Sequence, residues 1–309
     1  MRGLSRIVGA LVIVMLLGSV VSAPVAAAQR PLRIGILLKT LANPFWVSMK
    51  EGIEQEAAKL GIQVDIYAVP TEGDLRAQAE LLETMLQKGY DGLGVAPISP
   101  VNLIPGVAKA TAMGIPVVNI DEAIDKEELR KQGGFVYSFV TTNNFKVGEQ
   151  AGEFVVKSLG PQGGEVAIIE GAAGNKSGND RRDGFRSVVE RNPRLKLVAS
   201  QPANWDRMQA LNVATNLLQR FPRLRAIYCA NDTMALGAVQ AVINAGKQNQ
   251  VIVVGTDGIP EAVQAVKEGR LAATIAQDPA GIGAESLRLL VQALSIPQQA
   301  EVPSKLITR

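Results

Sequence analysis

Short apolar runs recur along the chain between residues 32 and 276, separated by polar turns and longer amphipathic stretches. Most runs are apolar along their length instead of alternating with polar residues, which is typical of strands covered on both faces. The predicted strands are residues 32–38, 63–69, 92–96, 115–120, 135–140, 165–169, 195–200, 225–230, 251–255 and 271–276.

The stretches between these runs carry helix signals. After the first run, Asn43 can cap a helix, Pro44 suits its first position, and Gly61 ends it. Asp74 can cap a second helix, and Asp206 precedes another. Strands that alternate with helices in this way predict an α/β fold with parallel sheets and helices on both faces.

Ten strands with helical crossovers could form one large sheet, but chains of this length usually divide into domains of about 100 to 200 residues. The pattern alone places one boundary near residues 138–141. Because the sequence contains no low-complexity segment or long linker, we expect short crossings between the two halves.

The N-terminal residues have the layout of a secretory signal. Arg2 and Arg6 precede an apolar run over residues 7–21, and small residues follow up to Ala28. We therefore expect a signal peptide over residues 1–28, cleavage after Ala28 and a periplasmic location. The alternative, a retained anchor, is disfavoured because a membrane span needs about 20 apolar residues.

Charge and composition exclude several classes of function. The 32 basic and 29 acidic residues give a formal charge of +3, and loss of a signal with two arginines and no acid leaves +1. A nearly neutral chain is a poor partner for nucleic acid. The sequence has no histidine, and Cys229 is its single cysteine. This excludes Ser-His and Cys-His catalysis, imidazole zinc sites and a disulfide within the chain.

Polar and aromatic side chains follow nearly every predicted strand. In open parallel sheets, ligands bind beyond the carboxyl ends of the strands. Each Asn or Asp taken alone is better explained as a helix cap or turn residue, but their coincidence favours a ligand site. The residues are Lys39, Asn43, Asp121, Glu122, Trp205, Asn231, Asp232, Asp257, Gln277 and Asp278.

This set of side chains suits a polyhydroxylated ligand. Carboxylates and amides pair with hydroxyl groups, and flat aromatic faces stack on the C–H faces of a ring. Only 4% of the residues are aromatic, so the placement of Phe45, Trp46 and Trp205 beside strand ends is informative. Ordinary helix packing is the alternative for Trp46.

The sequence lacks most of the enzyme motifs that it could be expected to carry. The segment 171–177 reads GAAGNKS, in which the lysine of a phosphate-binding loop is displaced by one residue, so we interpret it as a Gly-rich turn. No G-x-G-x-x-G motif opens the first strand–helix unit, which disfavours a nucleotide enzyme. A paired-carboxylate hydrolase using Asp121, Asp232 and Asp257 stays open, although nothing marks one as the acid and another as the nucleophile.

Several longer motifs occur along the chain in a recognisable order. They read LLKTLANPFWVSMKEGIEQEA, VNIDEAID, AIIEGAAGNKSGNDRRDGF, SQPANWDRMQALNVATNLLQ, AIYCANDTMALGAVQAV, VVGTDGIPEA and ATIAQDPAGIGA. Together they resemble periplasmic sugar-binding proteins of the ribose-binding type, over essentially the whole chain after the signal.

The resemblance implies two Rossmann-like lobes, each a parallel sheet flanked by helices, which are joined by a three-stranded hinge and enclose a sugar. It also implies discontinuous lobes, which refines the single boundary. The N-terminal lobe would comprise residues 30–138 plus 278–301, and the C-terminal lobe residues 139–277 plus 302–309.

The resemblance also implies roles for individual residues. Asn43 would hydrogen-bond the sugar, while Phe45 and Trp46 would stack on one ring face and Trp205 on the other. The strand-end pattern alone misses one contact, Arg181, because it is one of several basic residues in NDRRDGF. The matching polar contacts are Asp121, Arg181, Asn231, Asp257 and Gln277.

Two positions depart from the ribose-binding pattern. Lys39 stands where a small hydroxyl residue is common, and Glu122 follows Asp121 where an arginine is common. Both departures resemble the allose-type pattern. We therefore predict both as ligand-binding residues. The expected ligand is D-allose or a related sugar such as ribose or psicose, with D-allose or a close epimer preferred over ribose.

The resulting prediction is a monomeric periplasmic solute-binding protein that captures a monosaccharide and delivers it to the membrane permease of an ABC importer. It implies no catalytic residue, cofactor, metal or nucleic-acid partner. A sugar sensor for chemotaxis or signalling stays open, and a carbohydrate hydrolase is less favoured. The effector domain of a sugar-responsive repressor is disfavoured, because the signal occupies the place where a helix-turn-helix would be needed.

Overall fold

The computed structural model describes residues 30–295, and its ten strands match the ten predicted runs. They form two separate five-stranded sheets, in which every strand pairing is parallel. The α/β class predicted from the alternating pattern is confirmed.

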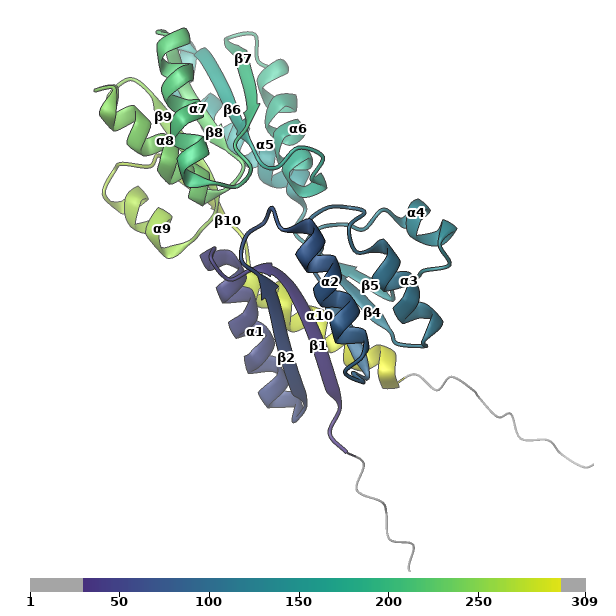
Figure 1. Ribbon diagram of the computed structural model, residues 1–309. Helices are drawn as coiled ribbons and strands as arrows, with labels where there is room; N and C mark the ends of the chain where they lie inside the picture. The colour runs from purple at the N-terminus through teal and green to yellow at the C-terminus, as the bar shows by residue number, and fades with distance from the viewer. Residues whose placement is uncertain (1–29, 296–309) are drawn as a thin grey trace, which may run out of the picture. The chain divides into compact units, whose positions relative to one another are not determined.

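The first sheet has the strand order β2-β1-β3-β4-β5. Its strands are β1 (Arg33–Thr40), β2 (Gln63–Val69), β3 (Gly92–Val95), β4 (Val117–Ile120) and β5 (Ser138–Val140). The helices around it are α1 (Pro44–Leu60), α2 (Leu75–Leu86), α3 (Ile104–Ala112), α4 (Lys126–Lys131) and α10 (Pro279–Ser295) (Figure 1). We call this group of elements the first lobe.

The second sheet has the order β10-β9-β8-β6-β7. Its strands are β6 (Gly164–Glu170), β7 (Leu195–Pro202), β8 (Leu224–Cys229), β9 (Ile252–Asp257) and β10 (Ala273–Ala276). The helices around it are α5 (Asn144–Leu159), α6 (Lys176–Glu190), α7 (Arg207–Arg220), α8 (Asp232–Asn244) and α9 (Pro260–Lys267), with a 3₁₀ turn at Gly160–Gln162 (Figure 1). We call this group the second lobe.

Both faces of the inner strands of each sheet are buried, as the continuous apolar runs require. In β1, Ile36 and Leu38 pack with residues of α1 and α10, whereas Leu37 packs with residues of α2 and α3 on the opposite face. The second sheet has two corresponding clusters, which include Ile169 on one face and Ile168 on the other. Successive residues alternate in side, so both faces need apolar cover.

The two sheets share one topology. Read from the β2 and β7 edges, each has its second strand at the edge, followed by its first, third, fourth and fifth. The order reverses between the first and third strands, that is, between β1 and β3 and between β6 and β8. Ligands of such sheets bind in the crevice at this switch point, beyond the carboxyl ends of the strands.

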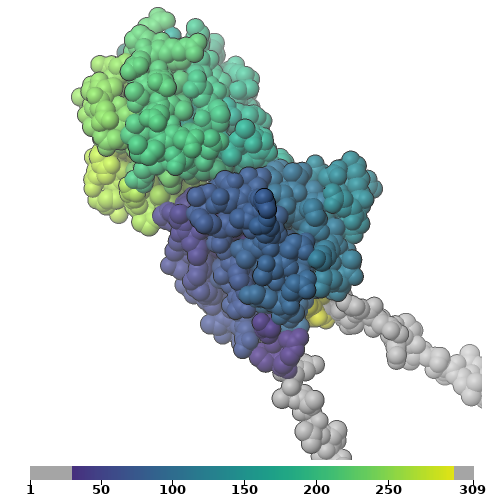
Figure 2. Space-filling view, viewed as in Figure 1, coloured from purple at the N-terminus to yellow at the C-terminus, as the bar shows by residue number. Residues whose placement is uncertain are grey.

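The chain returns to the first lobe in α10. A Cβ atom on Gly52 of α1 would lie 2.2 Å from the carbonyl oxygen of Ala280, so glycine allows the two helices their close approach. In Figure 2, yellow atoms of this returning segment lie at the lower edge beside the blue and purple atoms of the first lobe. The first lobe is thus built from two separate parts of the chain.

Helix ends follow the predicted capping residues with one exception. The Oδ1 atom of Asn43 accepts from the backbone N–H of Phe45, and Gly61 ends α1 with φ 65°. Asp206 caps α7 by accepting from Gln209. The prediction for Asp74 was wrong in detail, because its carboxylate accepts from Thr71 in the preceding turn and makes no side-chain cap to α2.

Several sequence predictions lie outside the described residues or are not tested by the fold. The signal peptide, its cleavage site and the segment 302–309 assigned to the C-terminal lobe lie outside the described range. The exact lobe limits stay a prediction. Between residues 30 and 295, no helix is both long and apolar enough to cross a membrane.

Candidate ligand-binding site

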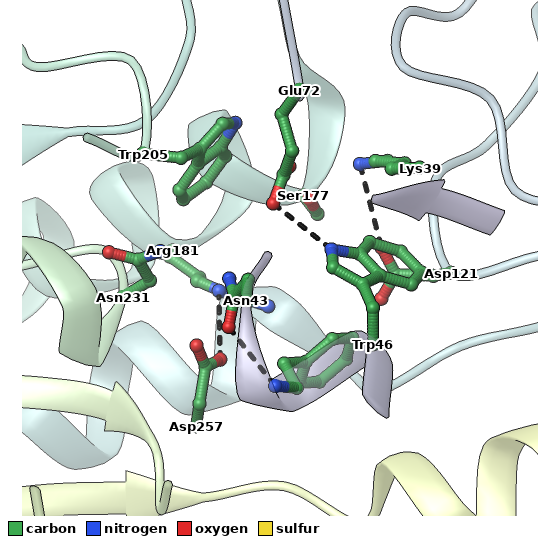
Figure 3. Close-up of a pocket in the computed structure, with 11 residues that line it drawn as sticks. Lys39, Asn43, Trp46, Glu72, Asp121, Ser177, Arg181, Trp205, Asn231 and Asp257 are labelled. Atoms are coloured by element: carbon green, nitrogen blue, oxygen red, sulfur yellow. Dashed lines mark hydrogen bonds and ion pairs between the residues drawn. The ribbon is translucent and has the colours of Figure 1, made fainter. Parts of the chain in front are cut away.

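The carboxyl ends of both sheets contribute side chains to one small cavity. Nine of the predicted ligand-binding residues line it, and the first five come from the first lobe (Figure 3). They are Lys39, Asn43, Phe45, Trp46, Asp121, Arg181, Trp205, Asn231 and Asp257. Their direct contact with a ligand stays a prediction.

Two aromatic rings form the cavity wall on the first lobe. Phe45 and Trp46, both in the first turn of α1, meet edge to face with ring centroids 5.1 Å apart and are 5% and 2% exposed. The indole N–H of Trp46 donates to Oε1 of Glu72 at 3.0 Å (Figure 3). This bond fixes the plane of the indole ring against the cavity, because the ring can no longer rotate freely.

Lys39 and Asp121 form a buried pair at the ends of β1 and β4. Their Nζ and Oδ2 atoms are 3.7 Å apart, and the Lys39 ammonium also lies 5.3 Å from the Trp46 ring centroid. The other carboxylate oxygen of Asp121 is buried and has no hydrogen-bond partner within the described residues. A buried oxygen without a partner is unfavourable, so this atom points to a bound hydroxyl or water.

The backbone of Asp121 is also strained. Its φ is 61°, a region that residues other than glycine rarely adopt. Its N–H donates to Val140, and its carbonyl accepts from the Thr141 hydroxyl at 2.7 Å, so the neighbouring strand holds the turn in place. Asp257 has φ 126° at the matching end of β9. Strain held by surrounding bonds is typical of functional sites.

Hydrogen bonds hold the guanidinium group of Arg181, a residue of α6, at the cavity wall. Its Nε donates to Oδ1 of Asn144 and one terminal nitrogen donates to the carbonyl of Ala230, both at 2.8 Å. The same terminal nitrogen lies 3.6 Å from a carboxylate oxygen of Asp257 (Figure 3). Burial raises the pKa of Asp257, and the positive charge of Arg181 opposes that rise.

Trp205 forms the aromatic wall on the second lobe, and two glycines make room for it. A Cβ atom on Gly171 would lie 2.1 Å from the indole ring, and one on Gly178 would lie 3.0 Å from it. The backbone of Trp205 has φ 63°, which turns the ring out of the chain after β7. Its ring centroid lies 6.0 Å from the guanidinium carbon of Arg181, within the range of a cation–π contact.

Asn231 explains how a capping residue can also serve a site. Its Oδ1 atom caps α8 by accepting from the backbone N–H of Met234 at 2.9 Å, as Asn43 does for α1. Both residues also line the cavity, and neither amide nitrogen makes a hydrogen bond within the described residues. Helix capping and ligand binding are therefore compatible at these positions.

A comparison with known proteins places the chain in a family. A model of the periplasmic binding protein domain matches residues 34–297. The chain belongs to this family. It is 57% identical to the D-allose-binding periplasmic protein of Escherichia coli, over 84% of this chain and 83% of that protein. It is 35% identical to the ribose import binding protein of Bacillus subtilis, over 91% and 88% of the two chains.

A solved structure agrees with the fold of this periplasmic binding protein. The structure is an ABC transporter periplasmic solute binding protein from Actinobacillus succinogenes with bound D-allose. The TM-score is 0.81 at 35% sequence identity, over 88% of this chain and 94% of that one. The family and the two-lobed fold implied by the sequence motifs are thus confirmed.

Glu122 and Gln277 are not among the residues that line the cavity, although both were predicted as ligand-binding. Both carboxylate oxygens of Glu122 accept backbone N–H groups, from Lys176 at 2.6 Å and Ser177 at 3.2 Å. Gln277 donates to Asp257 at 2.7 Å, while its Oε1 atom is buried without a partner in the described part of the chain. Gln277 thus positions the carboxylate of Asp257.

Asp232 also differs from its strand-end expectation. Its carboxylate is fully buried and accepts from the backbone of Gly258 and Ile259 and from the Thr274 hydroxyl, at 2.7 to 2.9 Å. Burial raises its pKa, and these bonds oppose the rise. Asp232 thus joins α8 to the turn after β9 and is a structural carboxylate.

Three residues around the cavity were missed by sequence reasoning. Glu72 and Ser177 line it, and Asn144 holds the guanidinium of Arg181. Glu72 follows the end of β2, so the strand-end rule could have found it, but the surrounding P-T-E-G segment has turn composition. Across residues 30–295, no group of three or more His, Cys, Asp or Glu residues could hold a metal ion.

Proposed function

We propose that this periplasmic binding protein captures D-allose, or a closely related monosaccharide, between its two lobes and delivers it to an ABC importer. The proposal is supported by the identity with the E. coli D-allose-binding protein and by the solved relative with bound D-allose. In this role the protein works as a single copy after export to the periplasm, and it releases the sugar chemically unchanged.

One observation carries the proposal. Aromatic rings from different lobes, Trp46 and Trp205, line the same cavity, together with buried charged side chains (Figure 3). A pyranose has two C–H faces that can stack on rings and a rim of hydroxyl groups that need donors and acceptors. We propose that the two rings stack on the faces of the sugar, while Lys39, Asp121 and Asp257 hydrogen-bond its hydroxyl groups.

The same arrangement gives a mechanism for capture. A ligand can shift a conformational equilibrium only by binding one state better than the other. A sugar that contacts both lobes favours the closed state, in which both sets of contacts form. A permease that distinguishes the closed state from the open state can then recognise loaded protein.

The preference for D-allose rests on the Lys39–Asp121 pair. Both groups are buried, and one Asp121 oxygen has no partner in the described residues. A sugar that supplies the missing hydroxyl satisfies that oxygen, whereas a smaller sugar leaves it unpaired at a cost of about 1–3 kcal/mol. D-allose should therefore bind roughly 5- to 150-fold more tightly than D-ribose.

Calorimetry with a panel of aldohexoses, aldopentoses and ketohexoses tests the proposal, with product analysis of each sugar afterwards. We expect D-allose among the tightest ligands and full recovery of every sugar. A preference for D-ribose would contradict the sugar assignment. Release of a new sugar product from a glycoside would contradict the transport role and favour a hydrolase.

A further inference from the structure

Glu122 makes a contact between the two lobes that the sugar site does not require. It follows β4 in the first lobe, and its side chain is 0% exposed. Its oxygens accept the N–H groups of Lys176 and Ser177, which are the first two residues of α6 in the second lobe. The carboxylate of one lobe therefore caps a helix of the other.

The position at α6 is suited to a negative charge. The first N–H groups of a helix have no partner within the helix, and the helix dipole places partial positive charge there. Asn175, the residue that caps α6, bonds with its own Oδ1 to Gly178. Glu122 takes the two N–H groups that Asn175 leaves, so the two residues share the helix end without competing.

A second contact lies beside it. The side-chain Nδ2 of Asn175 donates to the carbonyl of Ile98, in the first lobe, at 3.4 Å. The N-terminus of α6 thus meets the first lobe through Asn175, Lys176 and Ser177. These bonds join residues 54 to 77 positions apart in sequence, and they form only while the two lobes are together at this point.

We propose that Glu122 is an interlobe latch that stabilises the closed, sugar-loaded state without touching the sugar. This inference rests on the proposed function, since it concerns the closure that retains the ligand. Opening of the lobes separates Glu122 from α6 and returns its carboxylate to water. Closing exchanges that water for two backbone N–H donors, and hydrogen bonds to charged groups are among the stronger ones.

The latch makes two distinct predictions about binding, one about sugar selectivity and one about rates. Weakening it should lower the affinity for every sugar by the same factor, because it acts on closure. The ratio of D-allose to D-ribose affinity should stay unchanged. The loss should appear in the dissociation rate more than in the association rate, because the latch forms only after the ligand has entered.

The test compares E122Q with D125N as a matched control. Asp125 lies in the same loop and its carboxylate also caps a helix, but it accepts from Glu128 of its own lobe. Both substitutions replace a capping carboxylate by an amide. We expect E122Q to weaken D-allose binding about tenfold or more, whereas D125N should leave it within about twofold.

A second variant, K176P, removes one of the latch hydrogen bonds from the side of the second lobe. Lys176 is the first residue of α6, a position where proline is well tolerated, and Asn175 before it has the extended ψ of 126° that proline requires. The substitution removes the N–H that donates to Glu122 at 2.6 Å. If the two residues act as one latch, E122Q and K176P combined should weaken binding by less than the product of their separate effects.

Stopped-flow fluorescence and calorimetry with D-allose and D-ribose measure all these quantities, and circular dichroism confirms folding of each variant. Equal affinity of E122Q and native protein would overturn the latch. So would a changed ratio between the two sugars, which would place Glu122 on the ligand. Failure of native protein to bind either sugar would instead contradict the proposed function, so the two failures are distinguishable.

Discussion

Replacing Trp205 by alanine removes the aromatic wall that the second lobe contributes to the cavity. Trp205 is half-buried and lies against Gly171 and Gly178, which leave space only for its ring. Alanine keeps the backbone at φ 63°, so the substitution changes the wall and does not relieve the strain of the turn. The main effect should therefore fall on binding.

The expected loss follows from what the ring covers. Truncating a central aromatic residue of a binding site costs about 2–4 kcal/mol, which corresponds to a roughly 30- to 700-fold rise in Kd. The contact between Trp205 and Arg181 also exists without a ligand, so its loss adds little to the change in binding. Lost packing of the ring should lower the free energy of unfolding by about 1–2 kcal/mol.

Calorimetry with D-allose measures this loss, and W205F is the matched control because it keeps an aromatic face. We expect W205F to bind within about tenfold of the native protein, whereas W205A loses the full amount. A W205A variant that folds normally and binds D-allose within about threefold of the native protein would refute the stacking role and return Trp205 to ordinary packing.

Three further predictions concern the surrounding residues. D257N replaces an acceptor facing Arg181 and should weaken D-allose binding roughly 10- to 150-fold by calorimetry, with the sugar recovered unchanged; unaltered affinity would exclude Asp257 as a contact. G171A should push the Trp205 ring aside and weaken binding by tenfold or more, whereas G73A, where an added Cβ meets only the Thr71 hydroxyl at 3.5 Å, should not; equal effects would contradict the steric role of Gly171. Burial raises the pKa of Asp232 to about 6, so its carboxyl binds more protons in the folded state, and its contribution to the free energy of unfolding should fall as pH rises from about 4 to about 6. Melting curves of sugar-free protein should show a flatter fall in D232N, and an identical slope would contradict this.

Much of the fold could be predicted from the sequence because the local signals agree with the tertiary structure. Apolar runs such as that around Ile36 and Leu37 have both faces buried, and a strand covered on both faces must be apolar throughout. Asn43 and Gly61 mark the helix between the first two strands. The return of α10 to the first lobe was not visible in the local pattern, because it depends on contacts with α1 far away in sequence.

The site was harder to predict, because the sequence does not show in which direction a carboxylate at the end of a strand points. Asp121 and Glu122 are adjacent, yet Asp121 faces the cavity while Glu122 reaches α6. The φ of 61° at Asp121 separates them, and no sequence rule assigns that angle to an aspartate. Arg181 lies within a helix, so it was found only through the family motif. Which side chains line the site therefore depends on the tertiary structure.

A crystal structure of the protein with D-allose would show whether both lobes hold the sugar. We expect the sugar ring between Trp46 and Trp205, with hydrogen bonds to the unpaired Asp121 oxygen in the first lobe and to Asp257 in the second. Glu122 should remain on α6 and away from the sugar. A sugar bound outside this cavity, or held by one lobe alone, would contradict capture between the lobes.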